Sequence, residues 1–423
     1  MPTATVAGFL AEVLGDDVPV RFRAYDGSTL GPTDAASVIV IVSPDALRRI
    51  VTAPGELGFA RAYVAGDLEI EGDVFSVLEM LSRIRHVSIR PSTVATVSRV
   101  LGAQALRPLP PPAAEARLHG VRHSRARDAA AIAYHYDVPS DFFRIVLGPS
   151  MTYSCAVWTD DTPSLEQAQS QKHELVCRKL GLAPGMRLLD VGCGWASLVI
   201  HAALHHGVEA VGVTLSQTQA ELARCRVADA GVADHVEIRA VDYRDVHDGP
   251  YDAVSSIGMF EHVGLARLAE YFERCHALVA PRGRFLNHGI SRPGHMPPPN
   301  RLRALWQPLR RDFVERYVFP DGELHEIGAV VSAVQSAGFE VRHVESLREH
   351  YARTLRCWVA NLEAQWDAAV AEAGLDRARV WRLYMAAAAL GFEADTHQVH
   401  QVLATKTVAG ASGLPLRPEV ALP

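Results

Sequence analysis

The sequence predicts an α/β protein whose larger domain is a doubly wound parallel sheet, preceded by a smaller N-terminal α+β domain. Two observations predict the sheet. Strand-like and helix-like segments alternate from residue 165 to residue 290 with the spacing of βαβ units. The stretch Met186 to Ser197, MRLLDVGCGWAS, has the pattern of a buried strand that turns on two glycines and restarts as a helix. Such sheets bind ligands beyond the carboxyl ends of their strands.

The glycine loop gives the clearest single indication of a ligand. Gly192 and Gly194 allow a ligand to approach the backbone closely, where a side chain would block it. The helix expected from about Trp195 to Ala203 would present its first N–H groups to that ligand. Ser197 stands where a dinucleotide fingerprint has its third glycine, so a nicotinamide or flavin cofactor is disfavoured. A plain turn without a ligand is the alternative.

Composition indicates a globular chain of two or three domains. The 423 residues are 48% hydrophobic and 21% charged with a net charge of −6, which argues against a nucleic-acid partner. The six cysteines are scattered without CxxC pairs, so we expect neither a zinc site nor a disulfide framework. The N-terminus lacks a signal-peptide pattern, and no apolar run reaches the roughly 20 residues of a spanning helix. We therefore expect a cytoplasmic protein whose membrane contact is peripheral.

Domain boundaries follow from composition. Residues 1–105 contain short elements and carry no obvious chemistry, residues 106–127 are proline-rich and then basic and are predicted to be a linker, and residues 128–423 form the larger domain. In the first domain, strands are expected at residues 20–25 and 38–42, and helices at residues 46–51 and 75–84.

In the larger domain, the aromatic but polar segment Tyr134 to Trp158 predicts an amphipathic helix and a loop that pack on the sheet. Strands are expected at residues 186–191, 210–214, 236–240, 251–257, 284–290, 340–347 and 398–404, and helices at 165–180, 217–230, 265–278, 323–337, 354–373 and 377–390. In a parallel sheet, the residues that follow the strands share one edge. Those residues are Gly192, Thr214, Asp242, Glu261 and His288.

Seven short motifs occur along this domain: MTYSCAVW, LLDVGCGW, GVTLSQTQ, DYRD, GMFEHVG, RYVFPDGEL and HYARTLRCW. In this order they resemble the cyclopropane-fatty-acyl-phospholipid synthases and the related mycolic acid cyclopropane synthases, which are class I S-adenosylmethionine-dependent methyltransferases with a Rossmann-like sheet. The resemblance runs from about Tyr134 to Ala404, and the N-terminal unit resembles the extra domain of full-length bacterial synthases. It implies transfer of a methylene unit from S-adenosylmethionine to the cis double bond of an unsaturated phospholipid acyl chain.

The resemblance also implies the site residues. In this family a bound bicarbonate is held to be the base, and its ligands map onto Cys155, Glu261, His288, Ile290 and Tyr351. The cofactor-binding segments map onto Tyr153, Ser154, Asp190, Gly192, Gly194, Trp195, Thr214, Gln219, Asp242 and Tyr243. Each residue alone has an ordinary explanation, such as a helix cap for Glu261, a hydrogen-bonded strand histidine for His288 or a core side chain for Tyr351.

The product stays open on the sequence alone. Asn287 and Gly289 flank His288, where better-known members have a different local pattern. Loss of a proton from the added methyl group closes a ring, whereas a hydride shift before that loss leaves an exocyclic methylene, the precursor of a methyl branch. The branched product would need a separate reductase partner. A catalytically inactive scaffold that binds lipid and cofactor is the alternative from another class, and a homodimer is compatible with each of these functions.

One segment predicts how the enzyme reaches the membrane. Within Ser291 to Arg311, four apolar residues follow helical spacing and arginines flank them. This pattern predicts a short interfacial helix beside the acyl entrance, at the inner face of the membrane, although Pro308 would end the helix early. An ordinary surface loop is the alternative. The apolar residues are Leu302, Leu305, Trp306 and Leu309.

Overall fold

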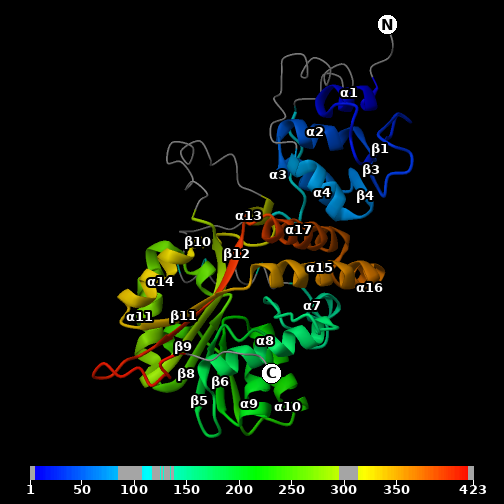
Figure 1. The fold of residues 1–423 in the computed structure, drawn as a ribbon. Helices are drawn as coiled ribbons and strands as arrows, with labels where there is room; N and C mark the ends of the chain where they lie inside the picture. Colours follow the sequence, from blue (N-terminus) through cyan, green and yellow to red (C-terminus); the bar gives the residue numbers. More distant parts are fainter. Residues whose placement is uncertain are drawn as a thin grey trace. The chain divides into compact units, whose positions relative to one another are not determined.

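The computed structural model describes residues 5–83, 107–116, 124, 127, 134, 138–294 and 313–417. The chain divides into two compact units (Figure 1). Unit 1 comprises Met1–Arg117, Pro299–Pro320 and Leu362–Leu390. Unit 2 comprises Leu118–Pro298, Asp321–Asn361 and Gly391–Pro423.

Unit 1 is built on a four-stranded sheet in the order β2-β1-β3-β4, in which β1 runs parallel to β3 and antiparallel to β2. Its elements are α1 (Val6–Leu14), β1 (Arg21–Ala24), β2 (Thr29–Leu30), β3 (Ser37–Ile41), α2 (Pro44–Thr52), α3 (Glu56–Val64), β4 (Leu68–Gly72), α4 (Val74–Arg83), α13 (Phe313–Tyr317), α16 (Trp366–Ala373) and most of α17 (Leu375–Glu393). The expected α+β character is confirmed, with α1 as an element that the sequence analysis does not anticipate.

Two late segments belong to unit 1 because buried polar contacts hold them there. Arg382 of α17 donates to the hydroxyl of Tyr63 at 3.1 Å and to the carbonyl of Gly72 at 3.0 Å. Glu115 is 5% exposed and accepts hydrogen bonds from Arg61 and from Arg316. The described part of the predicted linker, residues 107–116, is therefore held against unit 1, and the boundary drawn at residues 106–127 stays a prediction.

Unit 2 contains a sheet in the order β11-β12-β9-β8-β5-β6-β7, with β10 paired to the end of β9. Its strands are β5 (Arg187–Val191), β6 (Glu209–Thr214), β7 (Val236–Ala240), β8 (Tyr251–Ile257), β9 (Val279–Arg292), β10 (His325–Glu326), β11 (Glu340–Ser346) and β12 (Gln398–Thr405). The sheet is parallel from β7 to β9, but β12 runs antiparallel to both β9 and β11. The predicted doubly wound sheet is confirmed, and the closing strand β12 lies between β9 and β11 as its antiparallel part.

Helices cover both faces of this sheet, because successive strand residues point to opposite sides. Leu188 and Leu286 pack with α8, α9 and α10, while Leu189 and Phe285 pack with α11 and α14. Figure 1 shows α9 and α10 on one side of the sheet and α11 and α14 on the other. The helices of unit 2 are α7 (Ser140–Leu147), α8 (Leu165–Leu180), α9 (Ser197–His206), α10 (Gln217–Asp229), α11 (Leu268–Leu278), α14 (Ile327–Ser336) and most of α15 (Arg348–Ala364), with short turns η2 (Tyr243–Asp245), η3 (Phe260–His262) and η4 (Leu265–Arg267).

Three predicted helix boundaries are corrected. The helix expected at residues 323–337 begins only at Ile327, because His325 and Glu326 pair with β9 as strand β10. The helix expected at 354–373 is two helices, α15 and α16, which part at Gln365. The helix after the glycine loop begins at Ser197, because Ala196 has the left-handed φ of 69°.

Most of the predicted membrane segment, residues 291–311, lies outside the described residues, so the interfacial helix stays a prediction. Among the helices in the described ranges, none is long and apolar enough to cross a bilayer.

Candidate active site

The glycine loop joins β5 to α9 at the carboxyl end of the sheet. Gly192 has a φ of +81°, and its N–H and that of Cys193 both donate to the carbonyl of Val213, at 2.9 and 3.0 Å. A Cβ atom on Gly192 would come within 2.4 Å of the Met259 side chain, whereas one on Gly194 would meet nothing within 4 Å. Gly192 is therefore required both by its backbone conformation and by the close packing of the neighbouring loop.

A cleft opens over this loop and encloses about 840 Å³, counting the part open to solvent. It is formed by the segments that follow β5, β6, β7 and β8, as expected for this class of sheet. Five of the predicted cofactor residues line it: Gly192, Gly194, Thr214, Gln219 and Tyr243.

Thr214 and Gln219 shape one wall of the cleft. The Thr214 hydroxyl donates to Gln219 Oε1 at 2.9 Å and accepts from the N–H of Ser216 at 3.2 Å. These contacts fix the turn between β6 and α10. Strand β6 thus ends in a threonine–glutamine pair instead of an acidic residue. The amide nitrogen of Gln219 takes no part in this hydrogen bond and can donate to a ligand.

The other five predicted cofactor residues do not line the cleft that the described residues form. Asp190 is buried, accepts from the Ser255 hydroxyl at 2.6 Å and has its pKa raised to about 6 by burial. Asp242 is paired with Arg244, whose Nε lies 2.8 Å from the carboxylate. Of the remaining three, Tyr153 and Ser154 are half-buried and Trp195 is buried. The rings of Tyr153 and Trp195 both lie beside the ring of Phe143. Their role in cofactor binding stays a prediction.

Sequence reasoning missed four side chains of the cleft: Met259, His262, Arg244 and Arg267. Burial lowers the pKa of His262 to about 4, so its ring is neutral. Arg244 carries a guanidinium into the cleft while it holds Asp242. The signal for His262 was its place in the GMFEHVG motif, directly after Glu261.

Glu261 lies in η3, just beyond the end of β8. Its Oε1 accepts from the N–H of Ile290 at 2.7 Å. Ile290 belongs to the part of β9 that extends beyond the last residue paired with β8. Its Oε2 is buried and has no hydrogen-bond partner within the described ranges. Burial raises the pKa of Glu261 to about 7, although the bond from Ile290 opposes this. A protonated Glu261 can therefore accept at one oxygen and donate from the other.

Gly289 explains how this turn fits against the strand. A Cβ atom at residue 289 would lie 2.0 Å from Cε1 of Phe260 and 3.0 Å from Oε1 of Glu261. The glycine is needed for the ring of Phe260 to pack and for Glu261 to reach β9. The local departure noted in the sequence is thus a packing requirement of this site.

His288 lies within β9, level with the last residue of β8, rather than at a strand end. Lys179 donates to Gln401 Oε1 at 2.7 Å, and because an ammonium can only donate, this contact identifies the oxygen of the amide. Gln401 Nε2 then donates to His288 Nδ1 at 3.0 Å. Burial, helped by Lys172 and Lys179, holds the pKa of His288 well below its usual range, so the neutral ring carries its proton on Nε2. That N–H is buried and lacks a partner among the residues that the structure describes.

Cys155 and Tyr351 approach the same region through the backbone. Cys155 Sγ lies 3.6 Å from the carbonyl oxygen of Leu347, which also accepts from the N–H of Tyr351 at 3.1 Å. The N–H of Leu347 donates to Val399 on β12, and Val399 pairs with Ile290 on β9. Burial raises the pKa of the Cys155 thiol, so it is neutral. These contacts connect Cys155, the backbone of Tyr351 and Ile290, and His288 lies two residues before Ile290 on β9.

Lys172 on α8 is a further candidate that sequence reasoning missed. It is 2% exposed, and its charge acts on Asp190, Cys155 and His288. Burial lowers its pKa to about 8, with Asp190 opposing the shift. A buried ammonium at this position favours an anion nearby.

The chain matches a family model described as mycolic acid cyclopropane synthetase over residues 123–402. A probable fatty acid methyltransferase of Mycobacterium tuberculosis is 46% identical over 95% of this chain and 94% of its own length. A tuberculostearic acid methyltransferase of the same species is 35% identical over 94% of this chain and 90% of its own. A mycolic acid cyclopropane synthase solved with SAH and CTAB is 34% identical, with a TM-score of 0.60 over 65% of this chain and 97% of that one. The fold is that of the class I S-adenosylmethionine-dependent methyltransferases, and the chain belongs to the mycolic acid cyclopropane synthetase family.

Proposed function

We propose that this enzyme transfers a one-carbon unit from S-adenosylmethionine to the cis double bond of an unsaturated acyl chain and closes a cyclopropane ring. One relative that matches 95% of the chain is named a fatty acid methyltransferase, which supports an acyl substrate. The observation that carries the proposal is the pair of buried atoms without described partners, Glu261 Oε2 and His288 Nε2, beside the end of β8. Both are polar groups at the strand edge that also bears the cleft.

The residues that line the cleft fit the proposed cofactor in chemistry. Gly192 lets a ligand approach the backbone, while Gln219 and Arg244 supply donors on two walls. A related cyclopropane synthase was solved with SAH, which supports the same class of ligand here. When bound, S-adenosylmethionine supplies an electrophilic methyl group.

The donors at the base site fit a small oxyanion such as bicarbonate. His288 offers Nε2–H, and Glu261 offers a proton from Oε2 when it is protonated. Tyr351 has a hydroxyl of the same donor class, and the charge of Lys172 favours an anion. An anion held in this way would accept the proton that the added carbon loses on ring closure, and the electrons of that C–H bond would form the new C–C bond. The burial of Glu261 and His288 also keeps water from a reacting cation.

The decisive experiment is expression in a host that lacks such an enzyme, followed by gas chromatography–mass spectrometry of its phospholipid fatty acids. Both a cyclopropane and a methylene product add one CH₂ to the acyl chain, so proton NMR must separate ring protons from vinyl protons. We expect ring protons. S-adenosylmethionine binding without any new fatty acid would instead support an inactive scaffold.

Methylenation is the second candidate, and a specific comparison favours it. A relative named tuberculostearic acid methyltransferase is 35% identical over 94% of this chain, a share that includes the N-terminal unit. Vinyl protons in the NMR spectrum would select this product, and a reductase partner would then be needed to form a methyl branch.

The expected substrate is an unsaturated phospholipid, reached by peripheral contact at the cytoplasmic face of the membrane. This part of the proposal rests on the sequence resemblance and on the arginine-flanked pattern of residues 291–311. Co-sedimentation with anionic and neutral vesicles tests it. Charge reversal at Arg303 and Arg310 together with Trp306→Ala should weaken vesicle binding and leave S-adenosylmethionine binding intact. Unchanged vesicle binding would move the membrane contact elsewhere on the chain.

A further inference from the structure

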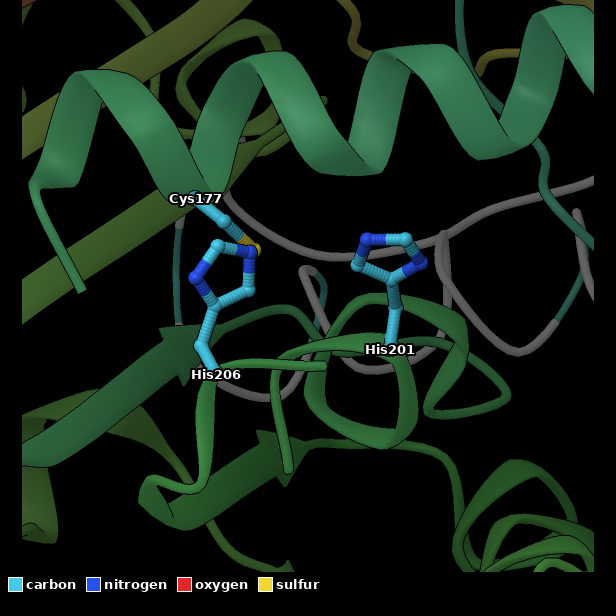
Figure 2. A group of neighbouring side chains, drawn as sticks. All are labelled: Cys177, His201 and His206. Atoms are coloured by element: carbon cyan, nitrogen blue, oxygen red, sulfur yellow. The ribbon is translucent and has the colours of Figure 1, made fainter. Parts of the chain in front are cut away.

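A second cluster of reactive side chains lies between α8 and α9, among residues that do not line the cleft. Cys177 is on α8, and His201 and His206 are on α9. Their candidate ligand atoms, the thiol sulfur and one nitrogen of each ring, all lie within 4.8 Å of one another. Figure 2 shows the two imidazoles reaching from their helix toward the helix that carries Cys177.

A carboxylate completes the cluster. Glu174, one helical turn before Cys177, has Oε2 3.3 Å from His201 Nε2 and 3.0 Å from His206 Nε2. Its other oxygen accepts from Arg178 Nε at 2.6 Å, which holds the carboxylate in place. One carboxylate oxygen therefore lies beside an Nε2 atom of each ring, and one nitrogen of each ring lies within 4.8 Å of the Cys177 sulfur.

We propose that Cys177, His201 and His206, with Glu174, bind a zinc-class divalent cation that joins α8 to α9. Zn²⁺ favours four ligands from thiolate, imidazole and carboxylate groups in a tetrahedron, with metal–nitrogen distances of about 2.0–2.1 Å and metal–sulfur distances of about 2.3 Å. Such lengths put neighbouring ligand atoms roughly 3.3–3.8 Å apart, so the nitrogen–oxygen separations already have about this size. Side-chain rotations would have to bring the sulfur closer to the imidazole nitrogens by up to about 1 Å, and would also have to bring it closer to Glu174, which lies outside the group of mutually close ligand atoms.

The donor set and its surroundings suit this role. The side chains of His201, His206 and Glu174 are 10%, 17% and 23% exposed, so an ion can reach them. Cys177 is fully buried, and it lies on the inner side of the pair of helices. On binding, the thiol proton passes to solvent, and bonds from the metal to sulfur, to two nitrogens and to one carboxylate oxygen replace the histidine–glutamate hydrogen bonds. The hydrogen bonds of Glu174 to both rings do not use the thiol, whereas a metal centre uses all four groups.

The test uses the full-length chain, freed of any purification tag and stripped with a chelator. Zn²⁺ is titrated against a chromophoric chelator, and Co²⁺ is titrated while the absorption spectrum is recorded. We expect one equivalent of each metal to bind, with a thiolate-to-cobalt charge-transfer band that requires Cys177. Loss of outer-sphere partners alone costs 10–100-fold in metal affinity, so His201→Gln with His206→Gln should weaken Zn²⁺ binding by at least about 100-fold. Zn²⁺ should also raise the Tm of the wild-type chain but not of this double variant.

Matched controls separate the site from surface histidines and thiols. His235→Gln removes an exposed histidine that is also paired with a glutamate, Glu209, at 2.8 Å. Cys225→Ala removes an exposed thiol on α10. Both controls should bind Zn²⁺ like the wild-type chain. The proposal fails if wild type and double variant bind Zn²⁺ alike, or if the cobalt spectrum of wild type equals that of Cys177→Ala. Either result would leave only a hydrogen-bonded pair of helices.

Discussion

Gln401 Nε2 lies 3.0 Å from His288 Nδ1, and this contact decides which nitrogen of the histidine carries the proton. Lys179 binds the other end of the amide, so Gln401 cannot turn around without facing an ammonium with its own NH₂ group. The predicted consequence is an Nε2–H that points away from the network and is available to an anion. Gln401 is thus a positioning residue for the proposed base site.

Gln401→Leu tests this assignment. Without a donor at Nδ1, the imidazole proton can move to Nδ1, and Nε2 then becomes an acceptor that repels an anion. We expect kcat to fall by about 10²-fold, the effect of a lost acid–base group, with little change in KM for S-adenosylmethionine. ¹⁵N NMR of the His288 ring should report the change of tautomer. Gln398→Leu on the same strand, which removes only a bond to Asp395, is the control and should retain activity. An unchanged tautomer in Gln401→Leu would contradict the assignment.

Glu261→Gln and His288→Ala separate binding from chemistry. Neither residue holds the glycine loop, so calorimetry should find S-adenosylmethionine affinity close to that of wild type. Turnover should fall by about 10²-fold or more, because each variant removes a group that can exchange or donate a proton. Added bicarbonate is expected to restore part of the activity of the variant that binds the anion less tightly. Normal turnover in both variants would rule out the anion site.

Burial of Glu261 should also appear in the pH dependence of stability. Its pKa is about 7 in the folded chain and about 4.3 in the unfolded chain, so between these values the folded state holds a proton that the unfolded state has lost. The free energy of unfolding therefore falls as pH rises through this window, by about 4 kcal/mol in total.

Urea unfolding at pH 5 and pH 8 checks this expectation. The free energy of unfolding of Glu261→Gln should lack the decrease that Glu261 causes in wild type. This variant should therefore be more stable relative to wild type at pH 8 than at pH 5. Asp190, whose pKa is raised to about 6 by burial, acts in the same direction in both proteins and cancels in the difference. A difference between the two proteins that does not change with pH would contradict a buried, protonatable Glu261.

The glycine loop gives a matched pair of substitutions. Gly192→Val places a branched side chain at a φ of +81° and against Met259, so we expect S-adenosylmethionine binding to be lost in a folded protein. Gly194→Ala meets no protein atom within 4 Å at a φ of +54°, so it should cost about 1–2 kcal/mol of stability and weaken S-adenosylmethionine binding less than Gly192→Val does. Circular dichroism verifies folding, and calorimetric titration measures affinity. Full affinity in folded Gly192→Val would exclude this loop as the cofactor site.

The sequence by itself determined the parts of the fold that depend on local patterns. Strands β7 and β8 and helix α8 have the predicted bounds, because burial on a strand or one helix face leaves a periodic signal in consecutive residues. The glycine loop is equally local. Thr214 ends β6 and Glu261 lies shortly after β8, at the edge that the sequence predicted, because strand ends in a parallel sheet share one edge.

The tertiary structure alone decided contacts between distant residues. Gln401 and His288 are 113 positions apart, and their contact depends on the register of antiparallel β12 against β9, which no local pattern encodes. The thiol and imidazoles between α8 and α9 escaped detection for the same reason, since cysteine spacing reports metal sites only when the ligands are close in sequence. Patterns along the chain report burial, whereas the pairing of side chains from separate elements follows from how those elements pack.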